Sequence, residues 1–474
     1  RRPRRSGDRR VGEMSELPSP ELAGTIVERA LANGGEFAEL FAERGGGTQM
    51  GIDESRVEDV TLASGGGAGV RVVKDGTAYF AHVDGIAEPD LERAADEAAA
   101  ALRGDRSEPV PLRAQETARQ EIRIPPDDVA ADRKAQMLRE LDDRARAQGD
   151  EIVQVRVSYG ESHRQIVVAN SAGTYATDDR TRLRLAAQSV ARRNGAAEVG
   201  FETLGGHAGF ELFDGDPGRI AEQAARKALT LLDADPAPAG SMPVVVGGGF
   251  GGVLFHEMTG HGLEVDHVHQ GASVYERLLG EVVAEPLVNA YDDGLLPGAW
   301  GTDGIDDEGT PAQKTQLIEE GRITSFLYDR LRAEHDGAEM TANGRRGSFR
   351  DLPIPRMTNT YIAPGDADPE EIISEVKRGF YAVSFAGGQV EPASGDFVFG
   401  VSEGYLIEDG KVTKPCRGAT LIGNCLDALA AIDAVGSDFD MKSGTCGKAG
   451  QWVPVGTGQG HVRIRQLTVG GTAV

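Results

Sequence analysis

The feature that most constrains the fold is an order of short strand-like runs, followed by a helical run, that occurs twice in the first half of the chain. Alternation of apolar and polar residues predicts a first group of strands at 36–43, 48–52, 57–63, 68–74 and 77–82. It predicts a second group at 151–160, 164–169, 173–178 and 181–192. This order is compatible with an internal duplication, but the two groups share too little sequence to assert one.

Helices with one apolar side accompany both groups of strands, and we place them at 19–33, 88–102, 127–147 and 216–233. Glycine supplies 64 of the 474 residues, about twice the usual ~7 %. We therefore interpret the glycine runs 45–47 and 65–67 as tight turns between strands. The proline-rich stretch 233–240 predicts a linker, so an N-terminal domain is expected at 19–236.

The second half of the chain predicts mostly strands. A strand at 243–246 and a glycine-rich turn at 247–252 lead into one helix, and turn signals at 319–322 and 408–411 separate alternating strands. Other helical runs are confined to 369–378 and 424–434. The expected fold class is α+β, with an N-terminal domain of antiparallel strands and helices and a mostly antiparallel β domain at 241–474.

Composition narrows the class of protein. The net charge of −25 disfavours nucleic-acid binding, which needs basic patches. No run approaches the ~18 apolar residues of a membrane span. Three cysteines do not suggest a disulfide framework, and they fit a reducing cytoplasm. The first ten residues hold six arginines, so we expect 1–18 to be a disordered extension, with Met14 as a candidate initiator.

Residues 256–261 read His-Glu-Met-Thr-Gly-His. Two imidazoles that bracket a glutamate can hold a metal and a water-activating base together. The usual zinc motif spaces its histidines four apart, whereas five steps on a regular helix turn two side chains roughly 140° from each other. We predict that this catalytic helix ends or distorts between His256 and His261, and that Gly260 and Gly262 permit the break.

Spacing alone does not choose a third metal ligand. The candidates are Glu264, His267, His269, Cys416, Cys425 and Cys446. A buried helix with two hydrogen-bonded histidines is the alternative to a metal site. Glu257 adjoins a ligand, so it is the candidate general base.

Other motifs carry weaker signals. The run 400–404, Gly-Val-Ser-Glu-Gly, matches a serine-nucleophile motif, but a strand rather than a helix is predicted to follow it. The glycine run 247–252 lacks the ending of a phosphate-binding loop and is interpreted as a close-packed turn. The acidic run 303–309 does not fit a calcium loop and is interpreted as a solvated loop. His335 and His461 are expected to be surface or structural residues.

Four stretches resemble the TldD/PmbA family of metallopeptidases: 251–264, 343–346, 353–361 and 446–456. The resemblance extends over roughly 20–474, and the chain is similar to the metal-bearing TldD side of the family. It implies that Cys446, in the Cys-Gly-Lys segment, is the third ligand of a Zn²⁺ ion beside His256 and His261. A thiolate suits zinc.

The resemblance also implies a zinc-dependent metallopeptidase that cuts unfolded or small peptides inside a chamber between subunits. A heterodimer with a metal-free paralogue is expected, with a homodimer as the alternative. Arg346, Arg356 and Tyr361 are candidate substrate-binding residues, and the strand-like run 357–362 is a candidate for pairing with a peptide backbone. Two other functions stay open: a non-catalytic interaction protein of the gyrase-modulator kind, and a zinc amidase for small molecules.

Overall fold

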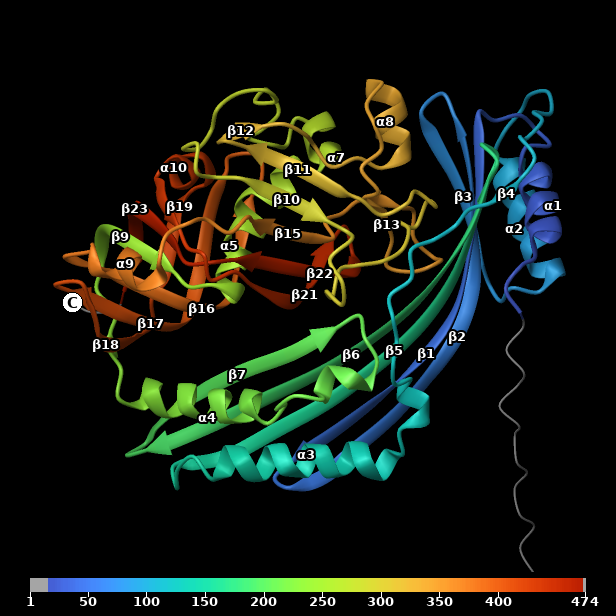
Figure 1. The fold of residues 1–474 in the computed structure, drawn as a ribbon. Coiled ribbons are helices and arrows are strands. Elements are labelled where there is room, and N and C mark those ends of the chain that lie inside the picture. Colours follow the sequence, from blue (N-terminus) through green and yellow to red (C-terminus); the bar gives the residue numbers. More distant parts are fainter. Residues whose placement is uncertain (1–15, 472–474) are drawn as a thin grey trace, which may run out of the picture.

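The computed structural model describes residues 16–471, so residues 1–15 of the expected extension lie outside the described residues. Helices and strands are mixed along the chain (Figure 1). A long, strongly curved sheet from the first half passes beside and beneath the body built by the second half (Figure 1). Among residues 16–471, no helix is long and apolar enough to cross a membrane.

Seven strands form the long sheet, in the order β3-β2-β1-β5-β6, with β4 and β7 both along β6. Their bounds are β1 (Phe37–Asp53), β2 (Arg56–Lys74), β3 (Thr77–Asp84), β4 (Arg113–Ala114), β5 (Ile152–Asn170), β6 (Thr174–Arg193) and β7 (Ala196–Gly206). All pairs are antiparallel except β4 with β6. Helices α1 (Pro20–Ala30) and α2 (Glu88–Ala100) cover one end of the sheet, and α3 (Ala131–Arg146) and α4 (Arg219–Leu232) cover the other (Figure 1).

The glycine runs are not turns, which corrects the expectation from sequence. They lie inside continuous strands, where Gly45 of β1 is paired with Gly65 of β2. A Cβ atom on Gly45 would overlap the carbonyl oxygen of His163 on β5, so these glycines permit close backbone approach. The true hairpin turns use positive φ at Glu54 and Ser55, which lets the strands continue past the glycines.

The second half builds a two-stranded sheet, β13 (Gly344–Arg345) with β14 (Ile354–Pro355), and two large sheets. One has the order β16-β9-β23-β19-β17-β18-β8, and a β16–β17 pairing closes part of it into a ring. The other has the order β12-β11-β10-β15-β22-β21. The bounds are β8 (Asp235–Pro236), β9 (Gly240–Val246), β10 (Ala290–Asp293), β11 (Lys314–Glu319), β12 (Arg322–Ile323), β15 (Asn359–Ile362), β16 (Arg378–Glu391), β17 (Asp396–Glu408), β18 (Lys411–Arg417), β19 (Thr420–Asn424), β21 (Asp440–Lys448), β22 (Gln451–Gln459) and β23 (Val462–Gly470).

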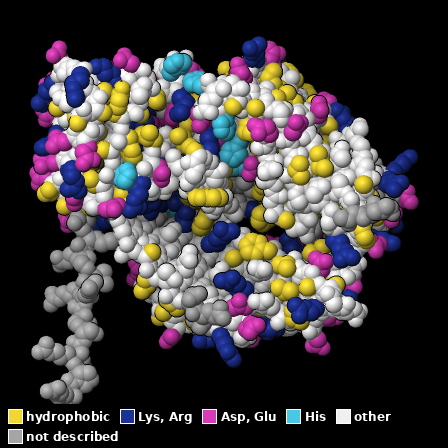
Figure 2. Space-filling view, turned by 180° about the vertical axis from the view of Figure 1, so that it is seen from behind, with side chains coloured by type: hydrophobic (Ala, Val, Ile, Leu, Met, Phe, Trp, Pro, Cys, Tyr) yellow, Lys and Arg dark blue, Asp and Glu magenta, His cyan; other side chains and the backbone are white. Residues whose placement is uncertain are grey.

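Helices in this half are short. They are α5 (Gly252–Phe255), α6 (His261–Leu263), α7 (Val265–His269), α8 (Arg330–Asp336), α9 (Pro369–Ser374) and α10 (Cys425–Ala430). The run 424–434 is only half helical, because Ile432–Val435 forms β20 against β23. α5 packs between the two sheets, with Leu254 and Phe255 in the largest apolar core. Seen from behind, a hollow separates the lower lobe, which holds α3 and α4, from the upper body (Figure 2).

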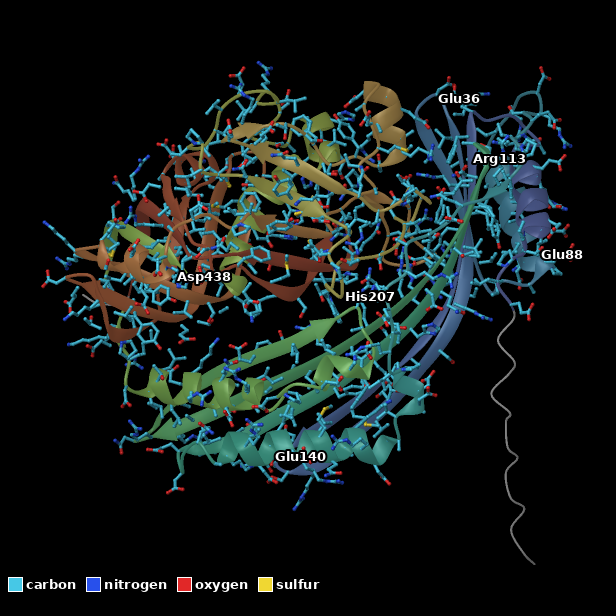
Figure 3. The ribbon with its side chains drawn as sticks, in the orientation of Figure 1. Glu36, Glu88, Arg113, Glu140, His207 and Asp438 are labelled. Atoms are coloured by element: carbon cyan, nitrogen blue, oxygen red, sulfur yellow. The ribbon has the colours of Figure 1, made fainter. Side chains whose placement is uncertain are left out.

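The acidic run 303–309 is buried rather than solvated, which corrects a second expectation. Its carboxylates pair with arginines of the long sheet: Asp307 with Arg180 at 2.7 Å, Asp303 with Arg182 at 2.5 Å and Glu308 with Arg71 at 2.6 Å. Burial alone would raise the pKa of Asp307, but Arg180 and Arg164 outweigh it and lower that pKa. His207, between the long sheet and the upper body in Figure 3, accepts from the Thr181 amide at 3.2 Å and bonds to the Thr302 carbonyl oxygen at 2.7 Å. These contacts fix the long sheet to the body that holds the candidate site.

Candidate metal centre

A π-helical turn, η4 (His256–Gly260), separates α5 from α6. The His261 backbone N–H donates to the His256 carbonyl oxygen, which is the i to i+5 bond of a π-helix. One wider turn therefore brings two histidines five residues apart onto the same side of the helix. The prediction that the helix distorts between them is confirmed.

Neighbouring side chains hold the π turn in place. The Tyr275 hydroxyl donates to the Met258 carbonyl oxygen at 3.0 Å. Gly260 has ordinary helical angles, so it does not permit the break through its backbone freedom as we expected. Its role is packing, since a Cβ atom there would overlap the Met357 sulfur, and one on Gly262 would overlap the Tyr275 ring.

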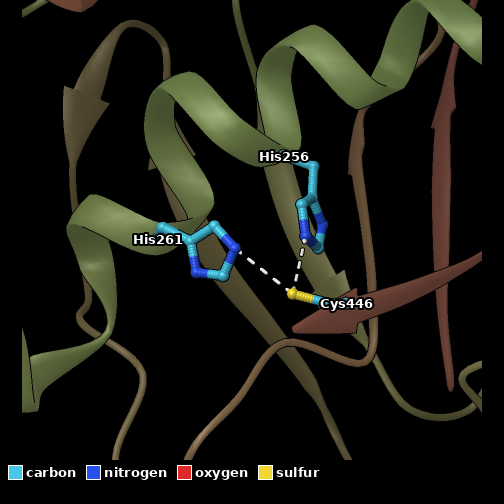
Figure 4. A group of neighbouring side chains, drawn as sticks. All are labelled: His256, His261 and Cys446. Carbon is cyan, nitrogen blue, oxygen red and sulfur yellow. Dashed lines mark hydrogen bonds between the residues drawn. The ribbon is translucent and has the colours of Figure 1, made fainter. Parts of the chain in front are cut away.

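Three possible ligand atoms converge at this turn (Figure 4). The Cys446 Sγ lies 3.4 Å from His256 Nε2 and 3.2 Å from His261 Nε2. The two imidazole rings are nearly perpendicular, at 83°. Cys446 comes from β21, so a strand late in the chain completes a group begun by the π turn. All three side chains are buried.

This group fits zinc on chemical and geometric grounds. Two imidazole nitrogens and a thiol are typical zinc donors, and bonds of about 2.0–2.3 Å place tetrahedral ligand atoms roughly 3.5 Å apart. The measured separations are close to that value. The second ring nitrogen of His256, Nδ1, is buried without a hydrogen-bond partner.

Electrostatics favours a thiolate at Cys446. Burial opposes ionisation, but His256 and His261 outweigh it and lower the pKa of Cys446 to about 4. Burial likewise disfavours charge on His261, yet Glu264 and Cys446 raise the pKa of His261 well above its usual value. The metal-free group is therefore a compact set of opposite charges.

A buried carboxylate orients His261. Glu264 Oε2 lies 2.8 Å from His261 Nδ1, which leaves Nε2 directed at Cys446. Glu264 in turn accepts from Lys448 Nζ at 2.9 Å, and Lys448 also reaches Asp266 at 2.6 Å. Glu264 was a candidate ligand by spacing, but it contacts Nδ1 of His261, on the side of the ring that faces away from Cys446. Sequence reasoning missed Lys448 and Asp266, although the Cys-Gly-Lys segment contains the lysine.

Glu257 lies beside the ligand group without being part of it. Its Oε2 is 3.8 Å from His261 Nε2, and 25 % of its side chain remains exposed. A carboxylate next to the ligands and open to solvent can exchange protons with a bound water.

The other candidate ligands lie in different surroundings. His267 Nδ1 bonds to the His261 carbonyl oxygen at 2.9 Å, and His269 bonds to Asp336. Burial raises the pKa of Cys416 to about 11 and that of Cys425 to about 12, which leaves both as neutral core thiols.

The three predicted substrate-binding residues are all buried. Arg356 donates to the Cys446 carbonyl oxygen at 2.7 Å and lies 3.9 Å from Glu264. Arg346 pairs with Glu39 of β1 at 2.5 Å, and the Tyr361 hydroxyl bonds to Asp293 at 3.2 Å.

The run 357–362 cannot take up a peptide strand, which corrects that expectation. β15, which occupies its second half, is paired with β10 on one edge and with β22 on the other. A strand with both edges hydrogen-bonded has no free ladder for a further chain.

The other motifs singled out in the sequence have structural roles. The run 400–404 continues inside β17, where Ser402 bonds to Ser384 at 2.9 Å. The glycine run 247–252 is a close-packed turn, because a Cβ atom on Gly252 would strike the backbone of Gly458. His461 is a structural residue held between Asp438, labelled in Figure 3, and Tyr381.

Comparison with known proteins identifies the family. Residues 38–102, 124–232 and 239–471 match the profiles of domain 1, the central domain and the C-terminal domain of the PmbA/TldA metallopeptidases. The chain belongs to the TldD/PmbA family. It is 39 % identical to the metalloprotease TldD homolog of Haemophilus influenzae, over 92 % of this chain and 93 % of that protein. It is 34 % identical to a metalloprotease of Methanothermobacter thermautotrophicus, over 92 % and 96 %.

Solved structures share the fold of this family member. TldE from Thermococcus kodakarensis superposes with a TM-score of 0.74 at 21 % identity, covering 92 % of this chain and 97 % of that one. A proposed modulator of a DNA gyrase from Thermotoga maritima gives 0.75 at 22 % identity, covering 92 % and 96 %. The names of these relatives identify the family as one of metallopeptidases. The buried group formed by His256, His261 and Cys446 is consistent with that activity.

Proposed function

We propose that this family member is a zinc-dependent metallopeptidase in which Glu257 is the general base. The observation that carries the proposal is the meeting of His256, His261 and Cys446, with Glu257 beside them. Three protein ligands leave one position open, as in catalytic rather than structural zinc sites.

The chain's own residues divide the work. A bound zinc ion supplies Lewis acidity, which lowers the pKa of water to about 7 and polarises a carbonyl group. Glu257 accepts the proton of the attacking water and delivers it to the leaving amine. Glu264 holds the orientation of His261, and Arg356 holds the backbone at Cys446. We therefore assign Arg356 a positioning role rather than contact with substrate.

Replacing the proposed base separates zinc binding from chemistry. Glu257→Gln should retain its zinc by elemental analysis and lose peptide hydrolysis by roughly 10²-fold or more, since the amide cannot accept a proton. The matched control is Glu281→Gln, which changes an exposed carboxylate. Hydrolysis within a few-fold of wild type would remove Glu257 from the mechanism. A zinc-loaded wild type that cuts no peptide would instead favour an interaction protein or a small-molecule amidase.

We infer that the substrate is an extended peptide read through its backbone. β21, the strand of Cys446, is the outer strand of its sheet among the described residues. The Cys446 carbonyl faces outward to Arg356, so the backbone groups of Gly444, two residues earlier, face the same way. A peptide added there would pass beside Cys446, and main-chain pairing gives little preference for particular side chains.

Assembly is the second part of this inference. Exposed apolar side chains on the long sheet, at Val60, Leu62, Val199 and Phe201, form surface that a partner subunit would cover. We propose a dimer that encloses the site, with a metal-free paralogue as the partner.

Enclosure predicts which proteins are cut. A short peptide or a denatured domain should be hydrolysed, and the same domain in its folded state should be spared. The measurement incubates this chain, alone and mixed with its paralogue, with both forms of one stable domain. Rapid degradation of the folded form by this chain alone would contradict both enclosure and the need for a partner.

A further inference from the structure

A second group of metal-ligand side chains lies outside the candidate catalytic centre. His269 at the end of α7 and His335 and Asp336 at the end of α8 place one ligand atom each within 4.8 Å of one another. Asp336 lies 2.9 Å from His269 Nε2 and 2.7 Å from His335 Nδ1. The two rings are 5.1 Å apart. One carboxylate thus joins two imidazoles from separate helices.

This group differs from the neighbouring one formed by Glu264, Asp266 and His267. There, the Lys448 ammonium already lies 2.9 Å from Glu264 and 2.6 Å from Asp266 and supplies the positive charge. At Asp336 the groups that face the carboxylate are two imidazoles and the Tyr328 hydroxyl, and the imidazoles can release a proton and bind a metal instead.

The second group opens to solvent. His335 keeps 73 % of its side chain exposed, and His269 keeps 28 %. Both histidines line a cavity of about 610 Å³ whose far wall is Glu36 and Phe37 at the start of β1. Figure 3 labels Glu36 at the upper end of the long sheet, beside α8. An ion can enter from this side without crossing the protein interior.

We propose that His269, His335 and Asp336 form a second transition-metal site that bridges α7 and α8. Two imidazoles and one carboxylate select zinc, cobalt, nickel or copper over magnesium and calcium, which prefer all-oxygen sites. With three exposed ligands, this site is weaker than the buried centre at Cys446. It fills only after the first equivalent of metal.

Binding here has a structural consequence. α7 follows the π turn after the short helix α6 and carries Asp266, which holds Lys448 against Glu264 behind His261. A metal that ties α7 to α8 therefore braces the support of the first centre. Because the ion binds the folded state, it also raises thermal stability, and the increase grows with the logarithm of the free metal concentration above the dissociation constant.

Cobalt distinguishes the two sites by absorption. The metal-free full chain is titrated with Co²⁺, and the first equivalent should give an intense thiolate-to-cobalt charge-transfer band because Cys446 is a ligand. A second equivalent should add visible d–d absorption and raise the melting temperature, with no further charge-transfer intensity. Cys446→Ser should lose the charge-transfer band and keep the second binding event.

The decisive variants are His269→Gln and His335→Gln, which should weaken the second event at least about tenfold, as losses around metals do. The matched control is His163→Gln, because His163 pairs with Asp179 without a second imidazole at that carboxylate among the described contacts. Binding of one equivalent only by wild type overturns the proposal. So does an unchanged second event in both variants, or its loss in His163→Gln.

Discussion

At the scale of single residues, the candidate centre depends on how one sulfur atom is charged. Cys446 is the only one of the described thiols that lies between two imidazoles, and its pKa is lowered while those of Cys416 and Cys425 are raised. Cysteine is therefore a candidate anionic ligand at position 446 and a neutral core thiol at positions 416 and 425. Surroundings rather than residue type decide the chemistry.

The metal-free protein should consequently show one thiolate at neutral pH. Ultraviolet absorbance of the thiolate, followed from pH 8 to pH 3, should fall with a midpoint near 4, because the pKa of Cys446 is lowered to about 4 and protonation follows as the pH drops. Cys446→Ser is the control and should show no such transition. No decrease in this absorbance between pH 8 and pH 3 would mean that the imidazoles do not stabilise the thiolate in solution.

The residues of the site were more predictable than their supports. His256, Glu257 and His261 stand together in the sequence, and Cys446 came from resemblance to a family. Lys448 and Asp266 carry no spacing signal, because they act through Glu264 across a sheet and a helix. The zinc, the general base and the substrate-binding roles stay predictions.

At the scale of elements, the π turn places His256 and His261, five residues apart, on the same side of the helix. Its Met258 carbonyl oxygen is satisfied by Tyr275 from outside the helix. A buried acceptor without a partner costs about 1–3 kcal/mol. The Tyr275 hydroxyl therefore contributes to the stability of the turn from outside the helix.

Tyr275→Phe should test that dependence, since it keeps the ring against Gly262 and removes only the hydroxyl. We expect a melting temperature lower by a few °C and weaker zinc retention against a chelator, because the two histidines are held less firmly. Tyr79→Phe, on β3 of the long sheet, is the control for loss of a tyrosine hydroxyl. Equal melting temperatures and zinc retention for Tyr275→Phe and wild type would show that the turn does not need this bond.

Strand positions were predicted well and strand lengths poorly. Alternation marked most segments of β1, β2, β5 and β6, but it missed β7 and divided each long strand, β1 and β2 at their glycine runs and β5 and β6 at 161–163 and 179–180, where there is no glycine. In the sequence, a glycine in a turn cannot be distinguished from a glycine that lets a neighbouring strand approach closely. At Gly45 the close contact with β5, which is visible only in the structure, shows that the second case applies.

At the scale of the whole molecule, buried ion pairs join the long sheet to the body that carries the candidate metal ligands. Arg71, Arg180 and Arg182 come from the sheet, and Asp303, Asp307 and Glu308 come from the body. The acidic run was expected to be solvated because sequence shows its charge but not the arginines that meet it more than a hundred residues away. The domain limits at 236 and 241 stay predictions.

Removal of an arginine from this buried network should destabilise the fold much more than removal of an arginine from a surface ion pair. Arg180→Met leaves Asp178 and Asp307 buried with fewer partners, which should cost about 3–5 kcal/mol. Arg29→Met breaks surface ion pairs with Glu92 and Asp96, and because this arginine is 39 % exposed its loss should lower the melting temperature much less. Melting temperatures of the two variants measure the difference. A similar, small decrease for both would contradict the assigned role of the network.

The same network has a consequence for how small a working version of this protein can be. A fragment of residues 239–471 would contain His256, Glu257, His261 and Cys446, and so every residue of the proposed chemistry. It would also expose Asp303, Asp307 and Glu308 without the arginines from the long sheet that neutralise them. Mutual repulsion among these carboxylates would disfavour the compact state of the fragment. The N-terminal half thus serves the candidate centre as a covalently attached folding partner, and truncation to residues 239–471 would yield an unstable chain rather than a minimal peptidase.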